Sequence, residues 1–343
     1  MKINILATAT GGAVGQGIIK SIKRSTLDHN IIATDAQPFA AGLYRAKVGY
    51  IVPLAESPYF TDEIIEICNK DNIHVILIGT ELELMTFAEN KKKIEKETNA
   101  KVIVSSPEVI EIANDKWKTY RFLKRHDLPF TPSVLPERVN AIMKEEGFPL
   151  IIKPRIGTSS QQVYIVRNSR ELGKYLPQVT NPIIQKYLPQ EEGEYTSTTL
   201  TFDKKCYGVL SMNRVMKFSG HTTKAIIDDF PESNKTIKKA AEVLNPFGPC
   251  NFQWRLTEKG PTIFEINCRF SGTTPFCAEL GFNTVEATIR HVVLNEKVGS
   301  LKQYKKGIVL RYFNEVYISS SEYDKMSRKK YISNPQSKVC ECF

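Results

Sequence analysis

The sequence lacks the features that mark membrane-spanning, secreted and zinc-binding proteins. Its 343 residues contain no apolar run close to the ~20 residues that cross a bilayer, and residues 1–7 lead directly into a short apolar strand instead of a signal peptide. The seven cysteines are an odd number without the paired spacing of a metal site, and Cys340 and Cys342 form a single Cys-x-Cys. We therefore expect a cytoplasmic protein without a membrane partner.

The sequence also lacks a nucleic-acid motif, although its net charge is +10. Its lysines are dispersed, and no alternation of basic and aromatic residues appears. Residues 302–343 hold about half of the excess positive charge. A solvated basic face, or attraction to anionic substrates, explains this charge better than a nucleic-acid partner.

The first hundred residues alternate between strand and helix patterns. Apolar strand patterns occupy residues 3–9, 31–34, 75–78 and 101–105, and helical patterns occupy residues 14–24, 59–71 and 82–93. Strands that alternate with helices form parallel sheets with helices on both faces. We therefore predict an α/β, doubly wound, Rossmann-like domain at residues 1–106.

The pattern becomes mixed α+β beyond residue 106. Helices are predicted at residues 107–113, 116–125, 234–244 and 283–294, and strands at 150–154, 163–166, 183–187, 195–202, 206–215, around 253 and 264, and at 307–317. The segment after Ser320 is polar, and we expect it to be loosely held.

Polar side chains on two late strands indicate a metal site. Glu265 and Asn267 are two residues apart on a strand and therefore share a face, and Gln253 lies on the strand before it. A carboxylate and amide oxygens suit Mg²⁺ bound together with the phosphates of a nucleotide. Arg269 would face the same site and contact a phosphoryl oxygen. The alternative is an ordinary hairpin whose polar residues face water.

Two lysines and an apolar strand indicate a nucleotide site. Lys153 ends a strand and precedes a loop of glycine and hydroxyl residues, which suits phosphate binding, although the loop is not a Walker A motif. Lys116 begins a helix behind Asn114, a candidate N-cap. The apolar strand at residues 183–188 could pair its backbone with an adenine. The alternatives are a surface hairpin, a solvated lysine and a core strand.

The N-terminal domain offers a third candidate site. Gly11 and Gly15 belong to a glycine-rich turn that opens the first helix, and Asp35 ends the second strand. This arrangement fits an anion pocket for the substrate, and the alternative is a dinucleotide site with Asp35 on the ribose. Glu81 follows a strand at the edge where such sheets bind ligands, and it either holds a substrate amine or stabilises a helix N-terminus.

The order of these motifs resembles the ATP-grasp superfamily, and most closely the synthetase units of the carbamoyl-phosphate synthetase large subunit. The run Gln253…Glu265-Ile-Asn267-Cys268-Arg269 matches the family motif Gln…Glu-x-Asn-Pro-Arg, with Cys268 in place of proline. The resemblance implies a two-lobed ATP-grasp domain at residues 107–300, with a lid lobe at about 126–187, followed by a C-terminal strand and basic tail at 301–343.

The resemblance also implies the roles of individual residues. ATP would be held by Lys116, Lys153, Thr158, Ser159, Ser160, Ile184, Gln185, Lys186, Tyr187, Leu188, Glu194 and His221, Mg²⁺ by Gln253, Glu265 and Asn267, and the transferred phosphoryl group by Arg269 and Arg214. Lys186 stands where an acid often binds the ribose, so Glu191, Glu192 or Glu194 would take that role.

The function implied by the resemblance is ligation. A carboxylate substrate would be phosphorylated by Mg-ATP to an acyl phosphate, which a small-molecule amine then attacks to give an amide. A homodimer is compatible with this reading. The glutaminase partner and second synthetase half of carbamoyl-phosphate synthetase do not occur in this sequence, so we do not expect the chain to make carbamoyl phosphate alone. The alternatives are an NAD(P)-dependent oxidoreductase that uses the N-terminal glycine loop, and a non-catalytic nucleotide- or nucleic-acid-binding protein.

Overall fold

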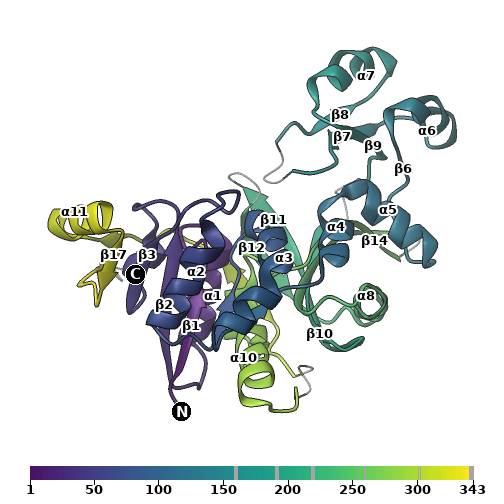
Figure 1. Cartoon of the computed structure of the whole chain (residues 1–343). Helices are drawn as coiled ribbons and strands as arrows, with labels where there is room; N and C mark the ends of the chain where they lie inside the picture. The colour runs from purple at the N-terminus through teal and green to yellow at the C-terminus, as the bar shows by residue number, and fades with distance from the viewer. Residues whose placement is uncertain are drawn as a thin grey trace.

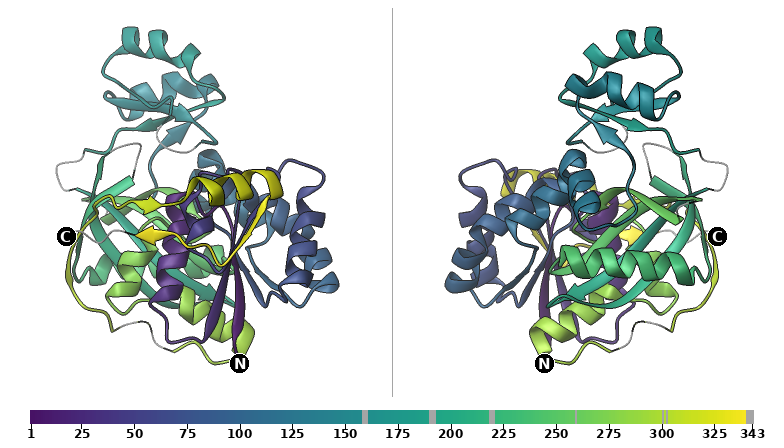
Figure 2. Two further views of the ribbon diagram at one scale, coloured as in Figure 1. Left: turned by 90° about the vertical axis from the view of Figure 1, so that its left-hand side faces the viewer. Right: turned by 90° about the vertical axis from the view of Figure 1, so that its right-hand side faces the viewer.

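The computed structural model describes every residue except 158–160, 190–192, 218–220, 259, 300, 302 and 340–343, and it describes 216, 217 and 221 by their backbone alone. Figure 1 shows two large sheets side by side and a small lobe above them. Both views of Figure 2 show the small lobe standing away from the two large sheets. The predicted arrangement, an α/β domain followed by a two-lobed domain, is confirmed.

The first sheet is the predicted doubly wound sheet. Its strand order is β17-β3-β2-β1-β4-β5, and β1 to β5 are parallel. The strands are β1 (Ile3–Ala7), β2 (His29–Asp35), β3 (Val48–Ile51), β4 (Val75–Leu77) and β5 (Lys101–Ile103), and the covering helices are α1 (Ala13–Lys23), α2 (Phe60–Lys70) and α3 (Glu81–Glu97). A short 3₁₀ helix (Ala41–Tyr44) precedes β3. Two apolar cores, one on each face, account for the burial of these strands on both sides.

The polar C-terminal segment is ordered, so the prediction of a loosely held tail is wrong. Residues after Ser319 form α11 (Ser320–Lys329) and β17 (Tyr331–Ser333), and β17 pairs antiparallel with β3. Met326 and Ile332 are almost fully buried in the core of the first sheet. Average polarity was misleading because two well-placed apolar side chains are enough to anchor the segment.

The second sheet is antiparallel, with strand order β14-β13-β10-β11-β12-β15. The strands are β10 (Glu194–Phe202), β11 (Lys205–Lys217), β12 (His221–Ile227), β13 (Gly248–Thr257), β14 (Gly260–Asn267) and β15 (Gly307–Leu310). The predicted single strand at 307–317 is therefore divided, because β16 (Val316–Tyr317) instead pairs with β18 (Lys338–Val339). Trp254 is fully buried in its core, stacks on Tyr195 at 4.3 Å and donates a hydrogen bond to Ser197 Oγ.

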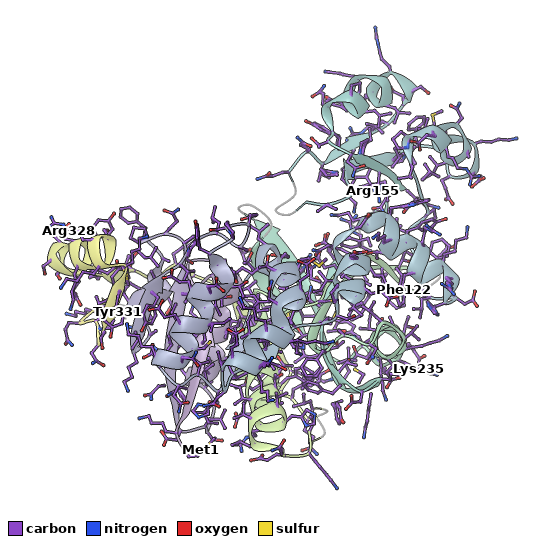
Figure 3. The ribbon with its side chains drawn as sticks, in the orientation of Figure 1. Met1, Phe122, Arg155, Lys235, Arg328 and Tyr331 are labelled. Atoms are coloured by element: carbon purple, nitrogen blue, oxygen red, sulfur yellow. The ribbon has the colours of Figure 1, made fainter. Side chains whose placement is uncertain are left out.

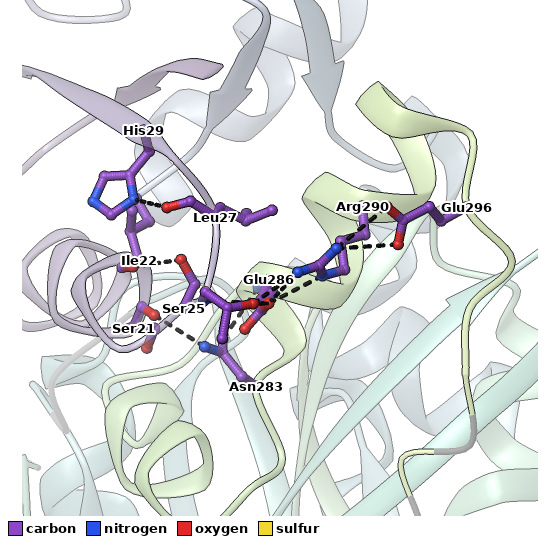
Figure 4. A network of polar contacts seen from close by, with 10 residues as sticks. Ser21, Ile22, Ser25, Leu27, His29, Asn283, Glu286, Arg290 and Glu296 are labelled. Carbon is purple, nitrogen blue, oxygen red and sulfur yellow. Dashed lines mark hydrogen bonds and ion pairs between the residues drawn. The ribbon is translucent and has the colours of Figure 1, made fainter. Parts of the chain in front are cut away.

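Five helices accompany the second sheet: α4 (Pro107–Asn114), α5 (Lys116–Arg125), α8 (Pro231–Leu244), α9 (Thr274–Glu279) and α10 (Thr284–Leu294). Helix α10 joins the two large sheets. Asn283 donates a hydrogen bond to the carbonyl of Ser21 on α1, and Arg290 donates one to Thr26 just beyond α1 (Figure 4). These contacts fix the α/β domain to the second sheet.

The small lobe has a sheet of order β6-β9-β7-β8 with its own apolar core. Its elements are β6 (Ser133–Val134), α6 (Val139–Glu145), β7 (Leu150–Pro154), β8 (Tyr164–Val166), α7 (Ser169–Tyr175) and β9 (Pro182–Lys186), with 3₁₀ turns at Pro136–Arg138 and Leu176–Gln178. Its sheet lies within the range 126–187 expected for a lid.

Two findings bear on the protein's surroundings. Among the helices that the structure describes, none combines the length and apolar character needed to cross a bilayer. Five cysteines of the described residues are buried free thiols, namely Cys68, Cys206, Cys250, Cys268 and Cys277.

Candidate active site

A cleft of about 330 Å³ lies between the small lobe and the second sheet. It contains ten of the residues predicted to form the nucleotide and metal site: Lys116, Lys153, Gln185, Lys186, Tyr187, Leu188, Glu194, Arg214, Gln253 and Glu265. These residues come from both lobes and span about 150 positions of sequence. Their convergence on one cleft is the main structural support for the predicted site.

The predicted metal ligands meet at the end of the β13–β14 hairpin. The register sets Gln253 opposite Glu265, and Asn267 lies two residues further along β14. Glu265 Oε1 accepts hydrogen bonds from Gln253 Nε2 at 3.2 Å and from Asn267 Nδ2 at 3.1 Å. Within the described residues no three His, Cys, Asp or Glu side chains cluster. One carboxylate with amide oxygens fits Mg²⁺ that shares its coordination with phosphates, which is the usual protein arrangement for this ion.

A β-bulge brings an aromatic ring into the same cleft. The register of the hairpin shifts so that Trp254 pairs with Ile263, and Phe264 is left without an opposite residue. Adjacent residues on a regular strand face opposite sides, yet Phe264 and Glu265 both line the cleft. Simple strand alternation could not predict Phe264 as a site residue.

The two predicted phosphate-binding lysines are buried. The alternative interpretations, a surface hairpin and a solvated lysine, would have left them exposed. Lys116 and Lys153 are each 7% exposed. Lys116 Nζ donates to the carbonyl of Gly157 at 3.2 Å. Asp115, and not the predicted Asn114, is the N-cap of α5 and also pairs with Arg155. This pairing anchors the start of the loop after β7 beside Lys116.

Lys153 is electrostatically unusual. Burial, with a further contribution from the positive charge of Lys116, lowers its pKa to about 7. Its Nζ lies 5.5 Å from the centre of the Phe264 ring. A buried ammonium group with a second lysine nearby favours a bound anion, which would restore its charge.

Two arginines and one glutamate form a buried network on the floor of the cleft. Arg214 Nη2 donates to Glu194 Oε1 and to Gln253 Oε1, each at 2.7 Å. Arg255 Nη2 donates to Glu194 Oε2 at 2.9 Å, and Arg255 also donates to the carbonyl of Leu188. The Nε atoms of both arginines are buried without a partner. These unused donors fit a polyanionic ligand.

Arg255 is a site residue that the sequence reading missed. It lies two positions after Gln253 on β13, so strand periodicity places both on one face. That signal was available in the sequence. Glu194 was predicted as a nucleotide contact, and its oxygens hold the two arginines in the structure.

The apolar strand at residues 183–188, which was predicted to pair with an adenine, is called the hinge segment here. It is only partly available to a ligand. Gln185 is 2% exposed, and its Nε2 donates to Ser133 Oγ while its Oε1 has no partner. Lys186 pairs with Glu146 at 2.7 Å, and its backbone N–H donates to Pro132. Ile184 lies in the apolar core of the small lobe and not in the lining of the cleft.

An apolar wall of the cleft was also missed. Ile151 lines the cleft from β7, Ile165 from β8 and Val163 from the residue just before β8, and Val163 and Ile165 are 36% and 39% exposed. Residues two apart on paired strands share a face, which gives one flat apolar surface. Such a surface opposite a charged floor suits a planar ring attached to phosphates.

Arg269 and Glu81, predicted to contact phosphate and substrate, pair with each other. Arg269 also donates to the carbonyl of Phe270 at 2.9 Å, and its Nε is buried without a partner. Although burial acts in the opposite direction, Arg269 holds the pKa of Glu81 below its ordinary value. Glu81 is therefore occupied by an arginine of the second domain instead of a substrate amine, and this pair bridges the two large sheets.

The N-terminal glycine turn is not an open anion pocket. Gly11 donates its N–H to Asp35 Oδ2 at 2.7 Å, and Asp35 Oδ1 accepts from Gln37 N, so Asp35 holds the turn closed. Gly15 is buried, and a Cβ there would lie 2.4 Å from the carbonyl oxygen of Ala9. The structure thus gives Gly15 a packing role at the start of α1, and its contact with a substrate stays a prediction.

Five of the predicted contacts lie outside the described residues. They are Thr158, Ser159 and Ser160 of the phosphate loop and Glu191 and Glu192 after the hinge. His221 belongs to the start of β12, and its side chain also lies outside the description.

Glu83 forms a second buried acidic site, two residues after Glu81. It lies in the first turn of α3, is 8% exposed and accepts a hydrogen bond from Thr8, which itself accepts one from the N–H of Gly79 at 3.1 Å. Burial raises the pKa of Glu83 to about 7. The negative charge of Asp35 also raises this pKa, whereas the hydrogen bond from Thr8 lowers it. Glu83 is therefore half ionised near neutral pH.

A Glu83→Gln variant tests this environment. A carboxyl group whose folded pKa exceeds its unfolded pKa stabilises the fold at low pH and loses this effect as pH rises through the folded pKa. The free energy of unfolding of Glu83→Gln, relative to the parent protein, should therefore rise between pH 4.5 and 8 by up to about 3 kcal/mol. Urea unfolding at both pH values measures this. Glu89→Gln, at an exposed position of the same helix, should show no such rise. A flat difference for Glu83→Gln would show that its pKa is not raised.

Comparisons with known proteins agree with the geometry. Residues 113–273 match the family model of the ATP-grasp domain, and residues 5–103 match that of the PylC-like N-terminal domain. The carbamoyl phosphate synthase large chain of Helicobacter pylori is 26% identical over 239 residues, and that of Clostridium botulinum is 23% identical over 324. These alignments cover 63% and 86% of this chain and only 22% and 29% of the relatives.

Solved structures with the same fold carry adenine nucleotides. The biotin carboxylase domain of the Hydrogenobacter thermophilus 2-oxoglutarate carboxylase, in complex with MgADP and bicarbonate, matches with a TM-score of 0.70 and 19% identity over 89% of this chain and 73% of that one. N5-carboxyaminoimidazole synthase from Aspergillus clavatus, in complex with ADP, matches with a TM-score of 0.69 and 14% identity over 92% and 82%. None of the proteins named here is an oxidoreductase, and Asp35 is already engaged, so the dinucleotide alternative has no support. Residues 113–273 therefore form a domain of the ATP-grasp family, which follows a PylC-like N-terminal domain at residues 5–103.

Proposed function

We propose that this protein is an ATP-dependent ligase that phosphorylates a small carboxylate and joins it to an amine. The observation that carries the proposal is the cleft, in which four cations lie near a metal-type carboxylate that accepts hydrogen bonds from two amides. The cations Lys116, Lys153, Arg214 and Arg255 come from both lobes, and the carboxylate is Glu265. Glu194 pairs with the two arginines, whereas the two lysines have no ion pair among the described residues, so the cleft keeps the positive charge that a metal-bound polyphosphate requires.

Three groups of residues in the cleft would contact the adenine, the phosphates and the metal ion, respectively. The apolar wall of Ile151, Val163 and Ile165 would receive the adenine beside the hinge. Lys116 and Lys153 would contact the phosphates, and Glu265 would hold Mg²⁺ with Gln253 and Asn267. Bound Mg²⁺ would supply charge neutralisation at the phosphate oxygens.

The chain's own residues then favour phosphoryl transfer by position and charge. Arg214 and Arg255 are held in place by Glu194, so their guanidinium groups need no reorganisation when negative charge develops on the transferred group. The small lobe would exclude water above the phosphates and so protect an acyl phosphate from hydrolysis. Arg269 stands beyond Asn267, on the side of the first sheet, where a substrate carboxylate would approach.

The proposal also covers the substrates, the cellular compartment and the oligomeric state. The substrates are a small carboxylate and a small amine, which bind between the cleft and the first sheet. The five buried free thiols favour a reducing cytoplasm as the working compartment. One named neighbour is a dimer in its crystal, which makes a homodimer a reasonable form to examine first.

The test is a screen for ADP release. Purified protein with Mg-ATP is incubated with single carboxylates, single amines and pairs of the two, and products are identified by mass spectrometry. We expect ADP release that needs a carboxylate and rises with an amine, together with an amide product. Release of ADP without any acceptor dependence or amide product would overturn the ligase proposal. Titration with NADH and NADPH completes the test, because specific binding of either cofactor would restore the oxidoreductase alternative.

A further inference from the structure

A second and larger cavity lies on the far side of α5 from the active-site cleft. It is a groove of about 1150 Å³ between α3, α4, α5 and the end of α8. Figure 1 shows α3 near the centre of the molecule and α4, α5 and α8 to its right, below the small lobe. Lys116 at the start of α5 lines the cleft, and the next turns of the same helix line the groove. The groove shares only this helix with the ATP site.

The rim of the groove is strongly positive. Six lysines and arginines line it against one acid, Glu108: they are Lys91, Lys118, Arg121, Lys124, Arg125 and Arg138. Lys118 pairs with Glu111, and Lys124 contacts the hydroxyl of Tyr120. Within the described part of the chain, Arg121, Arg125 and Arg138 have no ion pair. Uncompensated cations around one concave surface attract an anion.

Lys91 adds a cation that is partly removed from water. Its ammonium group lies 4.1 Å from the centre of the Phe247 ring, and no carboxylate of the described residues pairs with it. Burial lowers the pKa of Lys91. The charge of Glu95 raises this pKa, and the charge of Lys101 lowers it further. A lysine held in this way gains more from an anionic ligand than a solvated lysine does.

The floor of the groove is aromatic and apolar. Trp117 and Tyr120 are three residues apart on α5 and therefore adjacent on its surface, with ring centres 5.1 Å apart. Phe247, Val109 and Leu244 complete the floor from neighbouring elements. Flat rings beside guanidinium groups provide stacking for a planar ligand and ion pairs for its charged end.

We propose that this groove is a second ligand site, which binds a small anion carrying a flat aromatic ring, such as a nucleoside monophosphate. The ring would lie on Trp117 and Tyr120, and the anionic group would contact Arg121 and Arg125, one turn apart on the same helix. The site is separate from the ATP cleft and does not depend on the proposed ligase activity.

The experiment uses GMP as the probe and the full chain saturated with Mg²⁺ and a non-hydrolysable ATP analogue, so that the cleft is filled. Isothermal titration calorimetry should show one GMP bound per chain. Guanosine, which lacks the phosphate, and ribose 5-phosphate, which lacks the ring, should each bind at least about tenfold more weakly, because each loses one class of contact.

Variants locate the binding. The double variant Arg121→Ala/Arg125→Ala should weaken GMP binding at least about tenfold, since both side chains are exposed and each ion pair to a phosphate is worth that much. Lys235→Ala, at an exposed position of α8 outside the groove lining, is the matched control and should bind as the parent does (Figure 3). Retention of the Trp117 fluorescence of the parent by the double variant shows that α5 is intact.

Fluorescence gives an independent readout. The chain has two tryptophans, and Trp254 is fully buried, whereas Trp117 lines the groove. GMP should change the tryptophan emission of the parent, and the change should disappear in Trp117→Phe. The proposal is overturned if GMP fails to bind, if the double variant binds it as tightly as the parent, or if ribose 5-phosphate alone binds equally well. Binding of an acidic peptide in the groove with no binding of GMP would also overturn it, in favour of a protein partner.

Discussion

Glu265→Gln is expected to lower ATP turnover at least about a hundredfold, the scale on which loss of one preorganised electrostatic contact is felt. The substitution keeps the shape of the side chain and removes the only carboxylate among the three predicted metal ligands. Gln253 and Asn267 both direct an amide N–H₂ at Glu265 Oε1 in the structure. Neither amide can supply the missing negative charge.

Steady-state ADP release with the best acceptor pair measures the effect of Glu265→Gln, and the dependence of the rate on Mg²⁺ concentration separates weaker metal binding from misfolding. Glu258→Gln is the matched control, because Glu258 is exposed at the turn of the same hairpin. Normal turnover in Glu265→Gln at low Mg²⁺ would show that the metal binds elsewhere.

Lys153→Met should weaken ATP binding by roughly tenfold to a hundredfold at pH 6, since a hydrogen bond to a charged group contributes about 1.5–3 kcal/mol. The methionine retains the length of the buried apolar stem, so the fold should survive. The pH dependence is more diagnostic than the magnitude. The pKa of Lys153 is lowered to about 7, and a bound phosphate would raise it again.

A group that must be protonated to bind its partner gives the tightest binding below its free pKa. ATP affinity of the parent protein should therefore fall as pH rises above 7, by up to about tenfold per pH unit, and Lys153→Met should lack this fall. Calorimetric titrations with Mg-ATP between pH 6 and 9 measure both. Lys144→Met, at an exposed position of the same lobe, should behave as the parent. An identical pH profile in Lys153→Met would place the titrating group elsewhere.

The sequence predicted the elements of this protein where periodicity was strong. The helix at residues 116–125 and the strand at 150–154 have the bounds that were expected. Strand alternation placed Glu265 and Asn267 on one face, and the structure sets Gln253 of the preceding strand opposite Glu265. The lysines and the metal-type side chains of the cleft were found because each group carries its own local pattern, whereas the apolar wall was missed.

Most of the missed features depend on tertiary contacts. Phe264 enters the cleft through a bulge that no alternation rule indicates. The pairing of Arg269 with Glu81 joins residues that are 188 positions apart, and the closure of the glycine turn by Asp35 depends on how two strands end side by side. Arg255 is the exception, because its spacing from Gln253 was visible in the sequence.

The strand β17 has a consequence for synthesis of the chain. The first five strands of the first sheet end at residue 103, but the partner of β3 is not made until residue 331. Throughout that interval a nascent chain exposes the hydrogen-bonding edge of β3 and the pocket that later receives Met326, and unpaired edges of this kind promote association between chains. Pairing of the β3 edge therefore waits until residues 331–333 have been translated, so a chain that stops before residue 320 should aggregate through β3 even though every residue that lines the cleft is present.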